Sequence, residues 1–133
     1  MIFLDDMKDY IDSLKLNIDV FEANQPPKPD DCLTLVEYAG MPYEQGQTKT
    51  YGLQLLLRCK PQNYATMYEM LDTIIDALVE IGWEEGTMPE GKFINGHLYL
   101  RISMRESGII PLGKDDNGNI LLSKNFYVVK GEI

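Results

Sequence analysis

The chain has 133 residues, with 12 basic and 21 acidic side chains and a formal net charge of −9 at pH 7. This excess of acid argues against binding to duplex DNA or to an anionic membrane, because both need clustered Lys and Arg. No apolar run approaches the ~20 residues that span a bilayer, and the first residues lack the pattern of a signal peptide. With 44% hydrophobic residues, we expect one soluble, acidic, intracellularly made domain over residues 1–133.

The first sixteen residues predict an amphipathic helix. Apolar side chains recur there at helical spacing, at Phe3, Met7, Tyr10, Ile11 and Leu14. Three prolines between residues 24 and 31 then exclude helix and central strand, because proline lacks a backbone N–H and fixes φ. We expect a stiff surface connection there.

Residues 32–38 and 51–58 predict two strands. In the second strand, three leucines at every second position share one face, with Gln54 and Arg58 on the other. These leucines are Leu53, Leu55 and Leu57. The intervening residues 39–50 are long for a hairpin loop, and loops of that length are often functional or disordered.

Residues 63–81 predict a second helix, with Asn63 as a suitable N-cap. One face is apolar and consists of Met67, Leu71, Ile74, Ile75 and Leu78. Another face carries a stripe of exposed acids, Glu69, Asp72, Asp76 and Glu80. Such a stripe is typical of a solvated surface, and a recognition surface is the alternative.

Residues 97–105 alternate as a strand, so we expect its even-numbered apolar residues to face inward. These are Leu98, Leu100, Ile102 and Met104. The residues Asp116-Asn117-Gly118-Asn119, between two apolar stretches, indicate a tight hairpin turn.

The order of these elements predicts an α+β fold. We expect a single domain with a mainly antiparallel or mixed sheet and two helices packed on one face. The shared core is expected to contain Met67, Leu71, Ile74, Leu78, Leu53, Leu55, Leu57, Leu100 and Ile102.

The cysteines and the histidine do not point to a catalytic or metal site. Cys32 and Cys59 are too few for a disulfide scaffold or a structural zinc site. Reduced buried thiols are expected, and a cross-strand disulfide stays open because both lie on neighbouring strands. His97 has no acidic neighbour in the sequence, so a structural role is favoured over that of a catalytic base.

Two ligand motifs fail at a chemically necessary position. Residues 86–92 match the glycine and lysine spacing of a phosphate-binding loop, but Phe93 stands where Ser or Thr should hold magnesium. Residues 115–119 are similar to a calcium loop, but Ile120 occupies the position that needs glycine. We therefore expect neither a cofactor nor a metal or nucleotide site.

A degenerate nuclease pattern is the remaining enzymatic alternative. Asp30 and the segment Gln47-Thr48-Lys49 are similar to a metal-dependent nuclease pattern, in which two acids and a lysine meet at strand ends. The second acid is missing and no basic groove is evident. The protein is therefore expected not to be an enzyme.

A set of segments, spread over nearly the whole chain, resembles one protein family in order and spacing. The segments are Pro29-Asp30, Glu37-Tyr38-Ala39-Gly40 with Pro42, Leu53-Gln54-Leu55-Leu56-Leu57-Arg58, Tyr64-Ala65, Asn95-Gly96-His97-Leu98-Tyr99, Leu112-Gly113-Lys114-Asp115-Asp116-Asn117-Gly118 and Lys124-Asn125-Phe126. The family comprises small phage proteins once called minor capsid proteins and now regarded as tail terminators. Two positions depart from it, because the family often has a glycine pair at Ala39-Gly40 and an arginine at Asn119.

The resemblance implies a hexameric ring in the virion, at the head-proximal end of a long tail, assembled in the cytoplasm of the bacterial host. The implied partners are further copies of the chain, the tail tube protein and the head-neck connector protein. DNA would pass through without specific binding, which suits an acidic protein. A head-tail neck adaptor and a generic protein-interaction module are the alternatives.

A ring repeats one heterologous interface, so each subunit needs two different complementary patches. Exposed sheet edges and the long loop are available for them, and the loop holds apolar and aromatic anchors of the kind enriched in interfaces. The candidate interface residues are Met41, Pro42, Tyr43, Glu44, Gln47, Lys49, Asp116 and Asn117.

Overall fold

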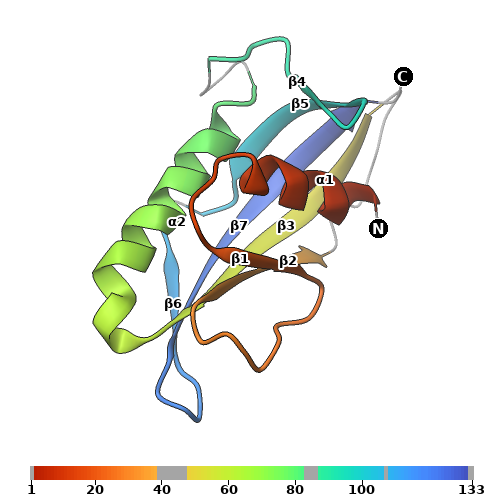
Figure 1. The fold of residues 1–133 in the computed structure, drawn as a ribbon. Helices are drawn as coiled ribbons and strands as arrows, with labels where there is room; N and C mark the ends of the chain where they lie inside the picture. Colours follow the sequence, from red (N-terminus) through yellow and green to blue (C-terminus); the bar gives the residue numbers. More distant parts are fainter. Residues whose placement is uncertain (1, 39–47, 83–86, 107, 132–133) are drawn as a thin grey trace.

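One mixed sheet forms the body of the protein. The computed structural model describes residues 2–38, 48–82, 87–106 and 108–131. The strands are β1 (Asp19–Glu22), β2 (Cys32–Tyr38), β3 (Thr48–Cys59), β4 (Lys92–Ile94), β5 (His97–Met104), β6 (Ile110–Lys114) and β7 (Ile120–Gly131). They lie in the order β1-β2-β3-β7-β5-β4, and β6 pairs with the first part of β7 (Figure 1). β1 and β2 are parallel and the other strand pairs are antiparallel, so the predicted α+β fold with a mixed sheet is confirmed.

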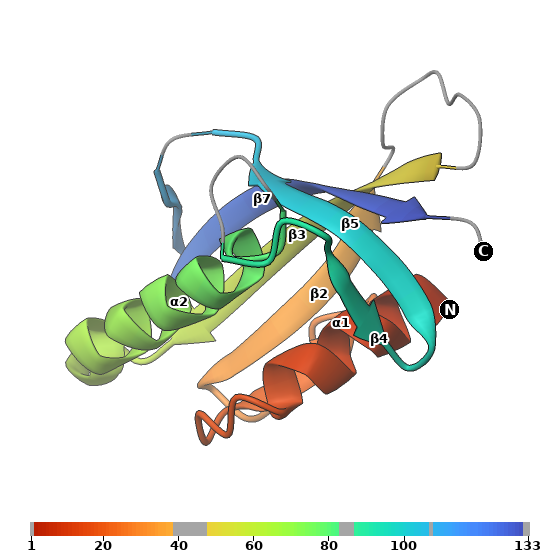
Figure 2. The same cartoon turned by 90° about the horizontal axis from the view of Figure 1, so that it is seen from above.

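Both helices pack on the same face of the sheet (Figure 2). Helix α1 (Ile2–Asp12) contacts β1 and β2, whereas α2 (Tyr64–Val79) contacts β3 and β5. A single 3-10 turn, Pro61–Asn63, leads into α2. Within the residues described, no helix is both long and apolar enough to cross a membrane.

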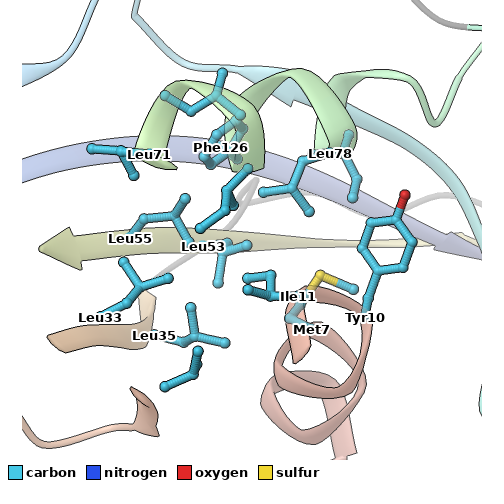
Figure 3. Packing of buried hydrophobic residues seen from close by; sticks show 14 of the residues in the cluster. Met7, Tyr10, Ile11, Leu33, Leu35, Leu53, Leu55, Leu71, Leu78 and Phe126 are labelled. Carbon is cyan, nitrogen blue, oxygen red and sulfur yellow. The ribbon is translucent and has the colours of Figure 1, made fainter. Parts of the chain in front are cut away.

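The apolar stripes of the two helices meet the leucine-rich face of the sheet. Figure 3 shows the side chains that converge there from both helices and three strands, among them Met7, Ile11, Leu33, Leu35, Leu53, Leu55, Leu71, Leu78 and Phe126. All of these side chains are buried. Of the predicted core residues, only Leu100 is not fully buried. The 3.6-residue and two-residue periodicities therefore located the core correctly.

The predicted alternation of β5 is wrong at its two ends. A β-bulge between Tyr99 and Arg101 inserts one residue and reverses which side chains face the core. As a result Tyr99 is fully buried, whereas Leu98 and Leu100 are half-buried. Met104, at the other end of the strand, is paired with Phe126 but is 37% exposed. Ile102 is the one member of the predicted inward set that is buried.

The first helix ends at Asp12, four residues earlier than predicted. Lys15 and Asn17 then adopt positive φ values of 55° and 57°, and this left-handed backbone ends the helix and reverses the chain. After the reversal the chain forms β1, a four-residue strand parallel to β2 that the sequence pattern did not predict. The second helix begins one residue after Asn63 as predicted, but the Asn63 side chain does not cap it.

The two cysteines lie on neighbouring strands but point to opposite faces. Cys32 is paired with Arg58 across β2 and β3, so Cys59 at the next position faces the other way. A disulfide between them is therefore excluded by the register, and both thiols are buried and free. Burial raises the pKa of Cys59 to about 11 and raises that of Cys32 as well.

Candidate functional site

The three predicted interface residues that the structure describes do not form one patch. Met41, Pro42, Tyr43, Glu44 and Gln47 lie outside the described residues. Lys49 is exposed near the start of β3, whereas Asp116 and Asn117 are exposed in the turn before β7. Since β3 and β7 run antiparallel over twelve residues each, these two places lie at opposite ends of a ladder that is roughly 35–40 Å long. They belong to two separate surfaces.

The acidic residues of the second helix form a continuous exposed stripe. Its members, Glu69, Asp72, Asp76 and Glu80, are all exposed. Helix α2 contains no lysine or arginine. Within the described part of the chain, none of these four carboxylates takes part in an ion pair. We call this feature the α2 stripe.

Three neighbouring rows of uncharged side chains lie on the sheet face opposite the helices, beside the row Asp19–Cys32–Arg58–Leu121. The strand registers place these rows across β2, β3 and β7 as Thr34–Leu56–Ser123, Val36–Gln54–Asn125 and Tyr38–Gly52–Tyr127. The backbone N–H of Arg105 donates to the Asn125 carbonyl at 3.0 Å, so Arg105 continues the middle row. We call these nine residues and Arg105 the open face, which has no helix over it in the described structure (Figure 2).

Tyr38 and Arg105 are held together on the open face. The Tyr38 ring lies across Gly52 so closely that a Cβ there would sit 2.5 Å from Cε2 of the ring. Its hydroxyl donates to the Phe126 carbonyl at 3.0 Å. The Arg105 guanidinium lies 5.5 Å from the ring centroid. A side-chain hydrogen bond with Tyr38 raises the pKa of Arg105, so this cation is retained.

A buried carboxylate ties α1 to the β4–β5 hairpin, which the sequence did not predict. Asp6 is 2% exposed. Its Oδ2 accepts from the Tyr99 hydroxyl and lies 2.8 Å from His97 Nδ1, and its Oδ1 accepts from Asn95 Nδ2 at 3.0 Å. The acidic partner of His97 is thus 91 residues away in the sequence. Burial, together with the bond to Asp6, raises the pKa of Tyr99 above its usual range.

A second polar cluster fixes the proline-rich segment against the far end of the sheet. Buried Arg58 donates from Nε to the Asp30 carbonyl at 3.2 Å and from its terminal nitrogen to the Pro29 carbonyl at 2.6 Å. The Asp30 carboxylate accepts from Lys28 at 3.0 Å and from Asn119 at 3.3 Å. The hydrogen bond from Lys28 lowers the pKa of Asp30. Asn119, one of the two positions that depart from the resemblance described above, is buried in this intramolecular cluster.

A polar groove of about 510 Å³ lies beside this cluster. It is lined by residues 17–19 and 28–31, with Lys60 and Met67. Asp31 in its wall accepts from the Lys60 backbone N–H at 2.8 Å and from Asn63 Nδ2 at 2.7 Å. The contact with Asn63 explains why that side chain does not cap α2. Both contacts show that the Asp31 carboxylate already has donors within the protein.

The geometry does not assemble the nuclease pattern. Asp30 is held at the Arg58 end of β3, whereas Lys49 lies at the other end of that strand. No group of three His, Cys, Asp or Glu side chains within the described residues could hold a metal ion. The raised pKa values of Tyr99 and both thiols also oppose nucleophilic roles, because the deprotonated form is the nucleophile.

The comparisons with known proteins agree with the fold and identify the family. A search of curated proteins finds no significant match. One solved structure, whose name carries no functional description, matches with a TM-score of 0.59 at 12% sequence identity and covers 98% of this chain and 91% of the other. That likeness shows the fold alone. The family model described as bacteriophage tail terminator protein matches residues 4–130, and the chain therefore belongs to the bacteriophage tail terminator family.

Proposed function

We propose that this protein forms a ring of identical subunits, expected to be a hexamer, that ends polymerisation of a phage tail tube. The match of the tail terminator family to residues 4–130 is the observation that carries the proposal. The ring lies at the head-proximal end of the tail in the virion and offers the surface that joins the head. Its partners are further copies of the chain, the tail tube protein and the head-neck connector protein, and the protein is not an enzyme.

The physical requirement of such a ring is two different axial surfaces. A tube of stacked rings grows as long as each new ring presents the surface that the next one recognises. A terminating ring matches the tube on one side and presents something else on the other. The two exposed places at opposite ends of the β3–β7 ladder support this proposal, because they differ in residue type and are far apart.

The net charge of −9 supports passage of DNA through the ring without retention. Sequence-independent binding of DNA depends on neutralising phosphates with clustered Lys and Arg. An acidic protein lacks that source of affinity, so DNA can slide past it during packaging or ejection.

The test is removal of the gene from its phage, followed by electron microscopy of the lysate. We expect DNA-filled heads without tails, together with tail tubes of abnormal and variable length, and rescue by the wild-type gene on a plasmid. Tails of normal length that do not join heads would instead assign the protein to the neck adaptor role. Intact infectious particles would remove it from the virion and favour a generic interaction module.

A biochemical test addresses the ring and the nuclease separately. Mass photometry and negative-stain imaging of the purified protein, alone and with tail tubes, should show six-membered rings, whereas monomers or dimers in both samples would contradict them. Incubation with plasmid DNA and manganese or magnesium should leave the DNA intact. Metal-dependent cleavage that copurifies with the protein would revive the nuclease alternative.

A further inference from the structure

The acidic side chains of the two helices differ in whether they have partners within the subunit. On α1, Asp6 and Asp9 accept from Asn95, and Asp12 pairs with Lys8 at 2.7 Å. These acids are thus engaged within the subunit. The α2 stripe has no such partner in the described part of the chain.

The open face has the opposite character. None of its ten residues is acidic, although the chain carries 21 acidic side chains. Its exposed charge is the cation of Arg105, which rests on the Tyr38 ring. The carboxylate of Glu106, the next residue in the chain, accepts through Oε1 from the backbone N–H of Asn125 at 2.8 Å. The open face therefore offers an arginine and the half-buried side chains of β2, β3 and β7 to whatever covers it, whereas Thr34, Gly52 and Ser123 are buried.

We propose that the open face of one subunit is covered by the α2 stripe of the next subunit in the ring. This inference rests on the proposed ring and names the two surfaces that its repeated contact joins. Both surfaces are present once on every subunit and they differ in shape and charge, as a heterologous interface requires. Opposite charges across such a contact favour this pairing and disfavour contact between two α2 stripes.

The dimensions of the two surfaces fit each other. Helix α2 has sixteen residues and is about 24 Å long. Strands β3 and β7 have twelve residues each and extend for roughly 40 Å. A helix can therefore lie along the central strands of the open face and place Asp72 or Asp76 beside Arg105, while its flanking side chains cover Val36 and Leu56.

The test is a charge exchange in phage that lack the gene, with variants supplied on plasmids. Arg105→Glu makes the open face repel the α2 stripe, and Asp72→Lys with Asp76→Lys makes the stripe repel the open face. Each variant alone should lower the yield of infectious particles at least about tenfold. The two variants expressed together should restore the yield, because subunits that alternate around an even-numbered ring place only opposite charges in contact. One chain with all three substitutions should also restore it.

Matched controls separate the contact from general charge effects and from misfolding. Arg105→Lys keeps the charge and should support normal yield. Asp12→Lys with Glu90→Lys makes the same change in net charge at exposed positions outside both surfaces. It should also be tolerated, because the exposed ion pair of Asp12 with Lys8 contributes little. Gln54→Glu adds an acid to the same row of the open face as Arg105, and it should reproduce the loss and its rescue by the lysine variant of α2.

Three results would overturn the inference while leaving the proposed function intact. One is normal yield from Arg105→Glu and Gln54→Glu, which is expected if the open face lines the lumen or faces solvent. The second is normal yield from the lysine variant of α2. The third is loss of yield in every charge variant without recovery in the mixture or in the triple variant. If wild-type protein itself does not rescue tail termination, the proposed function fails instead.

Discussion

The buried carboxylate of Asp6 gives the sharpest test of how α1 is joined to the β4–β5 hairpin. It lies on α1, and its two oxygens form hydrogen bonds with the side chains of Asn95, His97 and Tyr99 on the β4–β5 hairpin. Asp6→Ala removes the acceptor for all three at once. We expect the hairpin to loosen from α1 while the α2 side of the core keeps its packing.

The three partners of Asp6 contribute unequally because their exposure differs. Tyr99 is fully buried, so without Asp6 its hydroxyl loses its acceptor at a cost of ~1–3 kcal/mol. The His97 side chain is 37% exposed and Asn95 is exposed, so water can replace Asp6 for them and each contributes only ~0.5–1.5 kcal/mol. The free energy of unfolding should therefore fall by roughly 2–6 kcal/mol in all.

Urea unfolding measures this loss, and a double-mutant cycle assigns it. Tyr99→Phe removes the stranded hydroxyl, so Asp6→Ala should cost at least about 1 kcal/mol less in the Tyr99→Phe background. Asp9→Ala is the matched control, because Asp9 also accepts from Asn95 but is exposed, and it should cost less than about 0.5 kcal/mol. A loss below about 1 kcal/mol for Asp6→Ala, or strictly additive losses in the cycle, would refute the reasoning.

Three further predictions concern stability. Leu71→Ala should lower the free energy of unfolding by roughly 2–5 kcal/mol, because Leu71 is buried between α2 and the sheet; a loss below about half a kcal/mol in urea unfolding would contradict the layering. Gly52→Ala should cost ~1–3 kcal/mol, because its Cβ displaces the Tyr38 ring from Phe126, and Tyr38→Ala should remove most of that penalty. Burial raises the pKa of Cys59 from 9.0 to about 11, so the unfolded chain loses this proton first and stability should fall by about 2 kcal/mol as pH rises from 9 to 11. Urea unfolding across that range should show a smaller pH dependence in Cys59→Ala, and an unchanged dependence would contradict the assignment.

The elements that the sequence predicted well are those with long, regular patterns. The five apolar residues of α2 recur over three turns, and all five are buried. The alternating leucines of β3 likewise lie on the core face. The turn at residues 115–119 was predictable from its residue types, and Asp115 stabilises it by accepting from the backbone N–H groups of Asn117 and Asn119 at 2.9 Å.

The elements that the sequence did not predict are short or depend on distant contacts. β1 and β4 have four and three residues, too few for a period to emerge. The bulge in β5 is a backbone irregularity that reverses side-chain parity without a signature in the residue types. The bond between Asp6 and Tyr99 joins residues 93 positions apart, so no local pattern could indicate that this particular acid of α1 is buried.

Lys124 shows how a charged residue can occupy a core position without a compensating acid. It lies on the core face of β7 between Leu122 and Phe126 and is 1% exposed. Its ammonium group donates to the backbone carbonyls of Glu106 and Gly108, at the connection between β5 and β6. The long apolar stem packs in the core while the charge is satisfied at its edge. Residue type alone would have placed this side chain on the open face.

The net charge of a tail protein is therefore a poor guide to any one of its surfaces. Most acids of α1 form hydrogen bonds or ion pairs within the subunit. Asp30 and Asp31 likewise accept hydrogen bonds at the far end of the sheet. Among the described residues the exposed acids include the α2 stripe, Glu37 and Asp116, whereas none of the ten residues of the open face is acidic. If these two surfaces meet in the ring, each contact neutralises part of the charge that composition assigns to the exterior. The surface that DNA or a neighbouring ring encounters then depends on which face each contact covers as well as on the formal charge of the chain.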